Sequence, residues 1–145
     1  GSEMCIRDSD ILGDDGRFIR NKVFCEEQGF VNEFDETDTL VKAAWHLVLY
    51  CNNSPAATAR LICMNRKEGR YRIGRVAVLM EYRKMHLGSR LMQELEDIAK
   101  ANGARIMEVS AQCRAQKFYE SCGYNAHGQT YDDEGCPHIR MEKNV

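Results

Sequence analysis

The feature that most constrains the fold is a change in the spacing of apolar residues near the middle of the chain. From Tyr71 to Met80 the pattern is typical of a strand. From Leu87 onward, apolar residues recur every three or four positions, as on one face of a helix. The loop between the two is basic and contains Arg83 and Lys84. The chain is therefore predicted to run from a strand through a basic loop directly into a helix.

This order of elements creates a place where a phosphate group can bind. The N–H groups of the first helical turn have no partner within the helix, and the peptide dipoles place about half a positive charge there. Arg83, Lys84 and Arg90 would add positive charge near the same phosphates. Every helix has a first turn, however, and a glycine near it, here Gly88, is by itself weak evidence for a phosphate site. The loop alone therefore leaves phosphate binding open.

The rest of the chain reads as alternating strands and helices. We expect helices over residues 16–28, 87–102 and 112–122, and strands over residues 45–51, 56–64, 71–80, 105–110, 124–131 and 138–142. The turn residues Asn52 to Pro55 favour a hairpin between the first two strands. The pattern predicts an α+β domain with an antiparallel start, one strand-helix-strand unit and a final hairpin.

Length and charge narrow the class of protein. With 145 residues, 43% of them hydrophobic, the chain is expected to form one domain over residues 10–145. Residues 1–9 resemble residues left by tag removal followed by translated adaptor DNA, so the fold prediction depends little on them. The net charge of -2 gives no general attraction to nucleic acid or to anionic membranes. With no long apolar run and no signal peptide, we expect a cytoplasmic protein.

The seven cysteines are an odd number without any CxxC pair, which favours reduced thiols. The nearest approach to a metal-binding pattern is formed by Cys122, His127, Cys136 and His138. Their spacing matches no common zinc framework, so we expect no metal.

Two segments together resemble the GNAT superfamily of N-acetyltransferases. Its acetyl-CoA-binding motif is similar to Val76-Ala-Val, Glu81-Tyr82-Arg83 and Leu87-Gly88-Ser89, which precede an amphipathic helix. Its second signature is similar to Ala111-Gln112, Ala115, Phe118-Tyr119-Glu120 and Cys122-Gly123-Tyr124. The resemblance covers about residues 17–143, and two further stretches point to the ElaA-like branch: Val23-Phe24 with Glu27-Gln28-Gly29, Glu33, Asp35 and Asp38, and Glu134-Gly135-Cys136-Pro137-His138 ahead of Met141.

The resemblance implies a mixed, mostly antiparallel sheet flanked by helices, and an enzyme that transfers an acetyl group from acetyl-CoA to an amine. In this family the amine attacks the thioester directly, so the cysteines need no catalytic role. The implied cofactor-binding residues are Val76, Ala77, Val78, Arg83, Lys84, Met85, His86, Leu87, Gly88, Ser89, Gln112 and Tyr119.

One position departs from the family pattern. The loop usually reads Arg or Gln, two residues, Gly, one residue, and Gly or Ala, which places His86 where the first glycine is expected. Histidine tolerates an unusual backbone better than a β-branched residue does. Its ring could point to solvent, weaken coenzyme A binding or donate to a phosphate, and the sequence leaves all three open.

Catalysis needs a proton donor for the departing thiolate and a base for the amine. By resemblance, Tyr119 is the donor. For the base we expect Glu27 first, because burial at a helix end would raise the pKa of its carboxyl, then His138, then His46; Glu33 is also eligible. Each of these residues also has a purely structural explanation.

Other functions remain open at this point. A coenzyme A-binding sensor without turnover would use the same loop. Arg20, Phe24, Glu33, Asp35 and Asp38 also faintly resemble the signature of acyl-homoserine-lactone synthases, which are longer chains. The acceptor would be a small-molecule or peptide amine of unknown identity. A homodimer is an open alternative.

Overall fold

The computed structural model describes residues 3–145, which form a 7-stranded sheet with the order β1-β2-β3-β4-β5-β7-β6. All neighbouring strands pair antiparallel except β4 and β5, which are parallel. The strands are β1 (Met4–Ser9), β2 (Trp45–Cys51), β3 (Ser54–Asn65), β4 (Arg70–Val78), β5 (Ile106–Gln112), β6 (Asn125–Asp133) and β7 (Cys136–Asn144). The predicted α+β class is confirmed.

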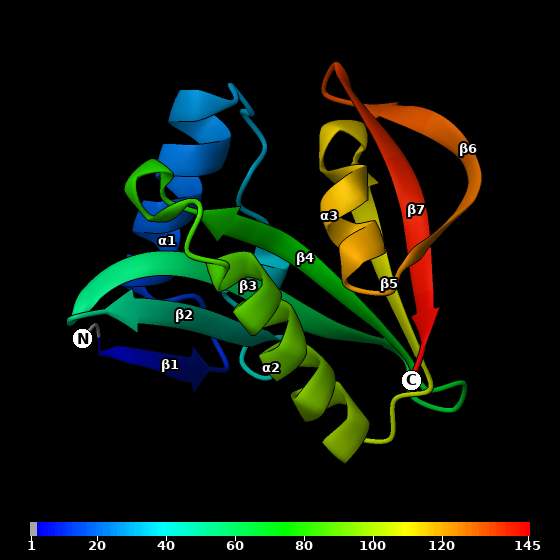
Figure 1. The fold of residues 1–145 in the computed structure, drawn as a ribbon. Helices are drawn as coiled ribbons and strands as arrows, with labels where there is room; N and C mark the ends of the chain where they lie inside the picture. The colour runs from blue at the N-terminus through cyan, green and yellow to red at the C-terminus, as the bar shows by residue number, and fades with distance from the viewer. Residues whose placement is uncertain (1–2) are drawn as a thin grey trace.

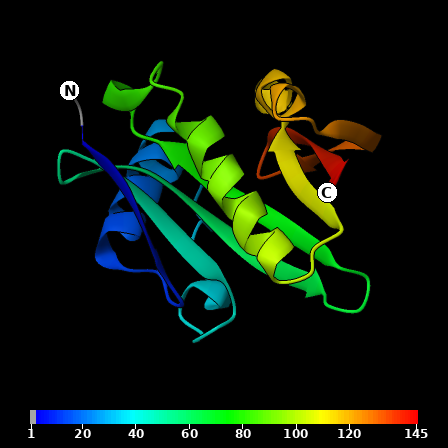
Figure 2. The same cartoon turned by 60° about the horizontal axis from the view of Figure 1, so that its bottom comes forward.

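Helices cover both faces of this sheet. Helix α2 crosses one face, and α1 lies on the opposite face, as Figures 1 and 2 show from two directions. Helix α1 continues without a break into a π-helix, η1, and α3 packs beside β5. The helical segments are α1 (Asp14–Arg20), η1 (Asn21–Glu27), η2 (Glu36–Asp38), η3 (Met80–Tyr82), α2 (Leu87–Ala101), η4 (Cys113–Ala115) and α3 (Gln116–Ser121).

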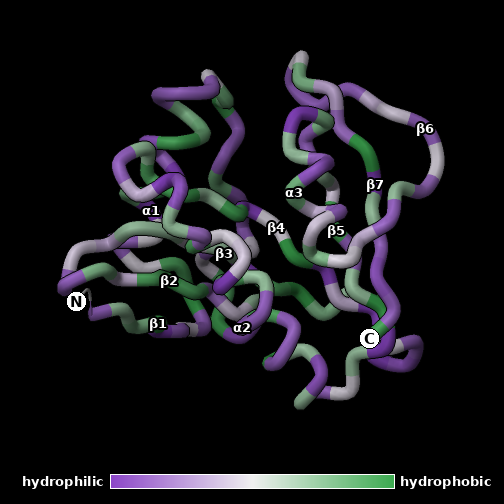
Figure 3. The backbone as a smooth tube through the Cα atoms, viewed as in Figure 1, coloured by the Kyte–Doolittle hydropathy of each residue, from purple (hydrophilic) through white to green (hydrophobic). Residues whose placement is uncertain are grey.

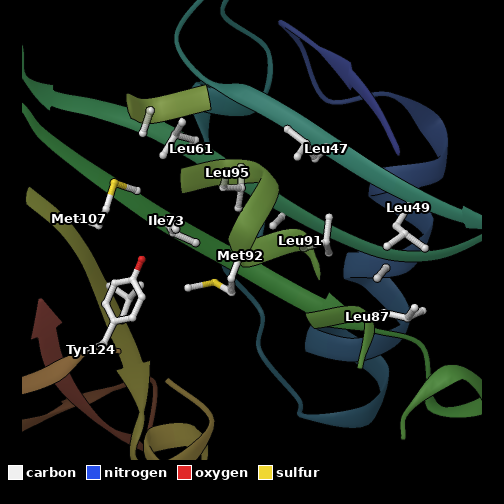
Figure 4. Close-up of a cluster of buried hydrophobic side chains, with 14 of the residues drawn as sticks. Leu47, Leu49, Leu61, Ile73, Leu87, Leu91, Met92, Leu95, Met107 and Tyr124 are labelled. Carbon is white, nitrogen blue, oxygen red and sulfur yellow. The ribbon is translucent and has the colours of Figure 1, made fainter. Parts of the chain in front are cut away.

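The main core lies between α2 and the sheet. Leu91 and Leu95 of α2 are completely buried, and they face Leu47 of β2 and Leu61 of β3 (Figure 4). The apolar residues gather on these strands and on the inner side of α2, whereas β6 is exposed along its length (Figure 3). The change of apolar spacing therefore predicted the element that covers the core.

The expected elements are present, with differences at their ends. Strand β2 has the predicted bounds, and Asn52 and Asn53 form its two-residue turn with φ of 49° and 71°, as a hairpin turn of this length requires. The second half of the predicted first helix is the π-helix η1. The predicted helix over residues 112–122 begins later, because Gln112 still belongs to β5.

The amino-terminal segment has a defined structure from residue 4 onward. Residues 4–9 form the edge strand β1, which pairs with β2 so that Arg7 lies opposite Val48. The expectation that residues 1–9 derive from cloning concerns their origin and stays a prediction.

Candidate active site

The sheet opens between its two parallel strands. Strands β4 and β5 are paired only from Arg70 opposite Ile106 to Ile73 opposite Val109. Beyond Ile73 they diverge, and Figure 1 shows the wedge between them, with α3 on the β5 side. At this point Arg75 has a φ of 54°, and the register of β4 against β3 shifts. This β-bulge bends β4 away from β5.

The opening exposes main-chain groups of β4. The N–H of Leu79 donates to the carbonyl of Ala56 on β3 at 2.9 Å. Because successive residues of a strand point their main-chain groups in opposite directions, the N–H and C=O of Val78 point away from β3 and into the opening. Consistent with this, Arg83 Nε donates to the carbonyl of Val78 at 3.0 Å. The N–H of Val78 is therefore directed at whatever fills the wedge.

A cavity of about 430 Å³ lies at the start of α2. Its wall brings together most of the expected cofactor-binding residues: Val76, Ala77, Val78, Arg83, Lys84, His86, Leu87, Gly88, Ser89 and Tyr119. Met85 and Gln112 do not line this cavity: Met85 is 38% exposed, and Gln112 lines a second cavity. Their assignment to the cofactor stays a prediction.

His86 adopts the backbone conformation that the family pattern assigns to glycine. It precedes α2 with φ of 58° and ψ of 29°, in the left-handed region. Histidine reaches this region at a modest cost, so the loop keeps its path without glycine. The side chain is exposed and lies on the wall of the smaller cavity.

Gly88 lies where α2 and α3 approach each other. A Cβ at this position would meet the ring of Phe118 on α3 at 3.1 Å, so the glycine allows α2 and α3 to approach each other. A side chain at this position would therefore collide with another part of the protein.

We expect Gly88→Val to reduce the free energy of unfolding by about 1–3 kcal/mol, because it overpacks the contact with Phe118. Coenzyme A binding should weaken as well, because displacement of Phe118 also moves the next residue, Tyr119, which lines the smaller cavity. Thermal melting and calorimetric titration measure the two effects. Ser89→Val is the matched stability control, since Ser89 is exposed. Equal melting of the two variants would contradict this account of Gly88.

A larger cavity of about 740 Å³ lies on the other side of the opening. It is lined from η1 and the loop after it, from β4 and β5, and from the hairpin that joins β6 to β7. The two cavities share the wall residues Gln28, Val76, Arg83, Ala115 and Tyr119. The two cavities therefore adjoin along these residues, and we call this place the junction.

Tyr119 lies at the junction. Its ring packs edge-on against Phe118, with a centroid distance of 5.0 Å, and against Tyr124 at 6.3 Å. Burial raises the pKa of Tyr119, so its hydroxyl stays protonated at neutral pH. The residue combines a packing role with a hydroxyl that can donate a hydrogen bond.

Glu27 also lines the larger cavity, but the pKa of its carboxyl is shifted in the direction opposite to the one expected. Arg83 Nη1 and Nη2 donate to its two carboxylate oxygens at 2.7 and 2.8 Å. These hydrogen bonds lower the pKa of Glu27, and they outweigh its slight burial. The expectation of a raised pKa is wrong, because the sequence did not show that Arg83 lies opposite.

His138 lines the larger cavity from β7. Its Nδ1 is 2.8 Å from the carbonyl oxygen of Cys136. Because a carbonyl only accepts, Nδ1 carries the hydrogen, and Nε2 of the neutral ring keeps its lone pair. The ring stacks on Tyr131, with a centroid distance of 5.9 Å. His138 is therefore held in one tautomer with a free basic nitrogen.

His46 is the third candidate for the base, and that role stays a prediction. It is buried in β2 with 2% exposure and lines neither cavity. Burial lowers its pKa, and the neighbouring charges are those of Asp38, Arg20 and Arg60. Its place is in the interior on the α1 side of the sheet.

Those charges belong to a buried network that the sequence did not reveal. We call it the Arg20 network: Arg20, Glu33, Asp35, Asp38, Arg60 and Arg75. Arg20 Nε donates to Glu33 Oε2 at 2.7 Å, and its Nη1 donates to Asp38 Oδ1 at 2.6 Å. The composition of the acidic segment after η1 is typical of a solvated loop. Its carboxylates are nevertheless largely paired with arginines. Its charges balance, as buried ionic groups require.

The network extends into the larger cavity through Glu33 and Arg75. Arg75 Nε lies 3.1 Å from Glu33 Oε2. Burial raises the pKa of Glu33, although Arg75 and Arg20 act in the opposite direction. For Asp38, burial also raises the pKa, but hydrogen bonds from Arg20 and from the Asp35 main chain lower it to about 2.

Removal of Arg20 should be costly. We expect Arg20→Met to reduce the free energy of unfolding by about 3–5 kcal/mol, because it leaves Glu33 and Asp38 buried without their main partner. Arg17→Met on the same helix is the control, because Arg17 is exposed, and should cost less than about 1 kcal/mol. Urea unfolding measures both. An Arg20→Met loss no larger than the control's would contradict the account.

Residues 3–145 contain no group of three or more His, Cys, Asp or Glu side chains arranged to hold a metal ion. No helix in that part of the chain is long and apolar enough to cross a membrane.

Comparison with known proteins identifies the family. The family model described as "Acetyltransferase (GNAT) domain" matches residues 22–145. The chain belongs to the GNAT acetyltransferases. This family uses acyl-CoA, and the resemblance read from the two sequence segments is confirmed.

Relatives match over most of their length. The chain is 34% identical over 129 residues to the uncharacterized protein YyaT of Bacillus subtilis, covering 88% of this chain and 85% of YyaT. It is 31% identical over 131 residues to the uncharacterized N-acetyltransferase YjcF of the same species, covering 90% and 91%. The crystal structure of Escherichia coli ElaA matches with a TM-score of 0.85 and 25% identity, covering 97% of this chain and 99% of ElaA.

Proposed function

We propose that this GNAT acetyltransferase moves the acetyl group of acetyl-CoA to a primary amine of a small molecule or peptide by direct attack, and that it does so in the cytoplasm. The observation that carries the proposal is the junction of the two cavities at Val76, Arg83 and Tyr119. A thioester in the smaller cavity and an amine in the larger one would meet there. No covalent enzyme intermediate is then needed.

The smaller cavity suits coenzyme A. The first turn of α2 offers the N–H groups of Leu87, Gly88 and Ser89 to the pyrophosphate, and Lys84 adds positive charge. The exposed edge of β4 suits the amide groups of the pantetheine arm. The N–H of Val78 would donate to the thioester carbonyl and stabilise the oxyanion, a contribution of about 3–4 kcal/mol.

The reaction itself makes one bond and breaks one. The neutral amine nitrogen attacks the carbonyl carbon, and the tetrahedral intermediate collapses with loss of the carbon–sulfur bond. The electron pair goes to sulfur, and Tyr119 donates a hydrogen bond or proton to the developing thiolate. The amide nitrogen loses its extra proton to the base or to water.

His138 is the base that the geometry favours. An aliphatic ammonium with a pKa of about 10.4 costs about 4.6 kcal/mol to deprotonate at pH 7, so a proton acceptor near the amine is valuable. His138 offers Nε2 in the larger cavity, whereas the carboxylate of Glu27 is bonded to Arg83. We therefore place His138 before Glu27.

A coenzyme A sensor is the alternative that the same cavity allows. Calorimetric titration of coenzyme A, together with a free-thiol assay over a panel of amino acids, polyamines, amino sugars, aminoglycosides and peptides, separates the two functions. We expect micromolar binding and thiol release with at least one class of amine. Binding without thiol release for any amine would identify a sensor, and absence of binding would contradict both.

A further inference from the structure

The larger cavity contains an arginine that no carboxylate of the described residues 3–145 pairs with. Three arginines line it: Arg75, Arg83 and Arg114. Arg75 is paired with Glu33, and Arg83 is paired with Glu27. Arg114 has no ion-pair partner among residues 3–145, and the carboxylate of Glu27, which feels the charge of Arg114, is bonded to Arg83.

The orientation of Arg114 is nevertheless controlled. Its Nε donates to Gln112 Oε1 at 2.7 Å, and Gln112 Nε2 donates to Gln28 Oε1 at 2.8 Å. This chain of hydrogen bonds joins η4, the end of β5 and the end of η1 across the cavity. It uses only one edge of the guanidinium, so both Nη groups remain free to donate. A planar group with two parallel donors is the usual partner of a carboxylate.

The position of Arg114 places such a carboxylate close to the reaction. Arg114 immediately precedes Ala115, which lines both cavities, and Tyr119 follows one helical turn later. An anion bound by Arg114 is therefore beside the junction where the amine attacks. The acceptor's carboxylate and its amine must be separated by only a few bonds.

The rest of the cavity fits the other parts of such a molecule. His138 lines the cavity, and its Nε2, which does not bond Cys136, can take the amine proton. Phe24, Phe30 and Ile73 give an apolar wall for a side chain. A volume of about 740 Å³ leaves room for one.

From this arrangement we infer that the acceptor is a free amino acid, or a closely related amine with a carboxylate a few bonds away, and that Arg114 binds the carboxylate. The inference rests on the proposed function and narrows its substrate class. It makes Arg114 a specificity residue and Gln112 the residue that positions it.

The test compares matched acceptors in matched variants. L-methionine, L-phenylalanine and L-glutamate are each assayed beside their α-amides, which keep the amine and side chain but lose the negative charge. Arg114→Ala should lower kcat/KM at least tenfold for the acids and less than threefold for the amides. Each loss compares the variant with the unaltered protein for the same acceptor. The different intrinsic reactivities of the amines in the acid and in its amide therefore cancel. The KM for acetyl-CoA should stay within twofold.

Three further variants refine the test. Arg114→Lys should recover part of the acid activity because it keeps the charge. Gln112→Glu, of nearly the same shape, should hold Arg114 in an ion pair and lower acid activity as Arg114→Ala does. Arg66→Ala is the control, because Arg66 lies outside both cavities and has no ion-pair partner within residues 3–145.

The outcomes separate this inference from the proposed function. If the protein acetylates amines but Arg114→Ala loses kcat/KM equally for acids and amides, the inference is overturned and the proposed function stands. The same holds if Arg114→Ala raises only the KM for acetyl-CoA. Absence of transfer to every amine overturns the function. In that case, calorimetry of the amino acids against the coenzyme A complex decides the inference separately: binding lost in Arg114→Ala supports it, and no binding to the unaltered protein overturns it.

Discussion

Replacement of His138 by Gln is expected to lower kcat/KM for the amine by about 10²–10⁴-fold at pH 7, the usual contribution of a general base. Glutamine retains polarity in the cavity but cannot accept a proton. The remaining activity should rise with pH, because the fraction of neutral amine increases tenfold per pH unit well below the pKa of the amine.

Glu27→Gln is the comparison that makes this result specific. It keeps the shape of the side chain and loses the charge that faces Arg83. We expect a smaller loss of kcat/KM at pH 7, less than about tenfold. Wild-type activity in His138→Gln together with a large loss in Glu27→Gln would return the role of base to Glu27.

The second large effect is expected at Tyr119. Tyr119→Phe should lower turnover by about 10–10⁴-fold, because it removes only the group that stabilises the departing thiolate. The phenylalanine ring keeps the contacts with Phe118 and Tyr124, so coenzyme A affinity and thermal stability should change little. Steady-state kinetics, calorimetry and thermal melting measure the three quantities.

Tyr50→Phe is the control for the loss of a tyrosine hydroxyl, because Tyr50 lies outside both cavities and bonds Asp15 on the α1 side. It should retain wild-type turnover. Full activity in Tyr119→Phe would leave Tyr119 with a packing role alone, and the thiolate would then be stabilised by other groups.

Local patterns in the sequence predicted much of the fold. The three-to-four spacing after Leu87 predicted α2, and the turn residues Asn52 and Asn53 predicted the hairpin between β2 and β3. These features depend on neighbouring residues, so a single sequence contains them. The strand-loop-helix order likewise predicted the wall of the smaller cavity.

The parts that the sequence missed depend on contacts between distant residues. Glu27 and Arg83 are 56 positions apart, and their pairing reverses the expected direction of the pKa shift of Glu27. The Arg20 network joins η2, β3 and β4 to α1, so its acidic members looked like a solvated loop. The role of Gly88 follows from Phe118 on another helix. A single sequence has no signal for such pairs.

The structure also contains a cavity of about 560 Å³ near Trp45, Cys63 and Tyr71, which lies apart from the β4–β5 opening and shares no wall residue with the two cavities described above. It provides an internal comparison for ligand binding. If coenzyme A uses the opening, the residues around this separate cavity should not respond to it.

Amide hydrogen exchange with and without coenzyme A tests the central claim most directly. The account predicts slower exchange at the N–H groups of Val78 and of Leu87 to Ser89, which have no partner in the strand and helix hydrogen-bonding patterns and would bind the cofactor. Exchange around Trp45 and Cys63 should stay the same. Unchanged exchange at Val78 and the first turn of α2, with protection around Trp45 instead, would contradict the placement of the cofactor and the reaction built on it.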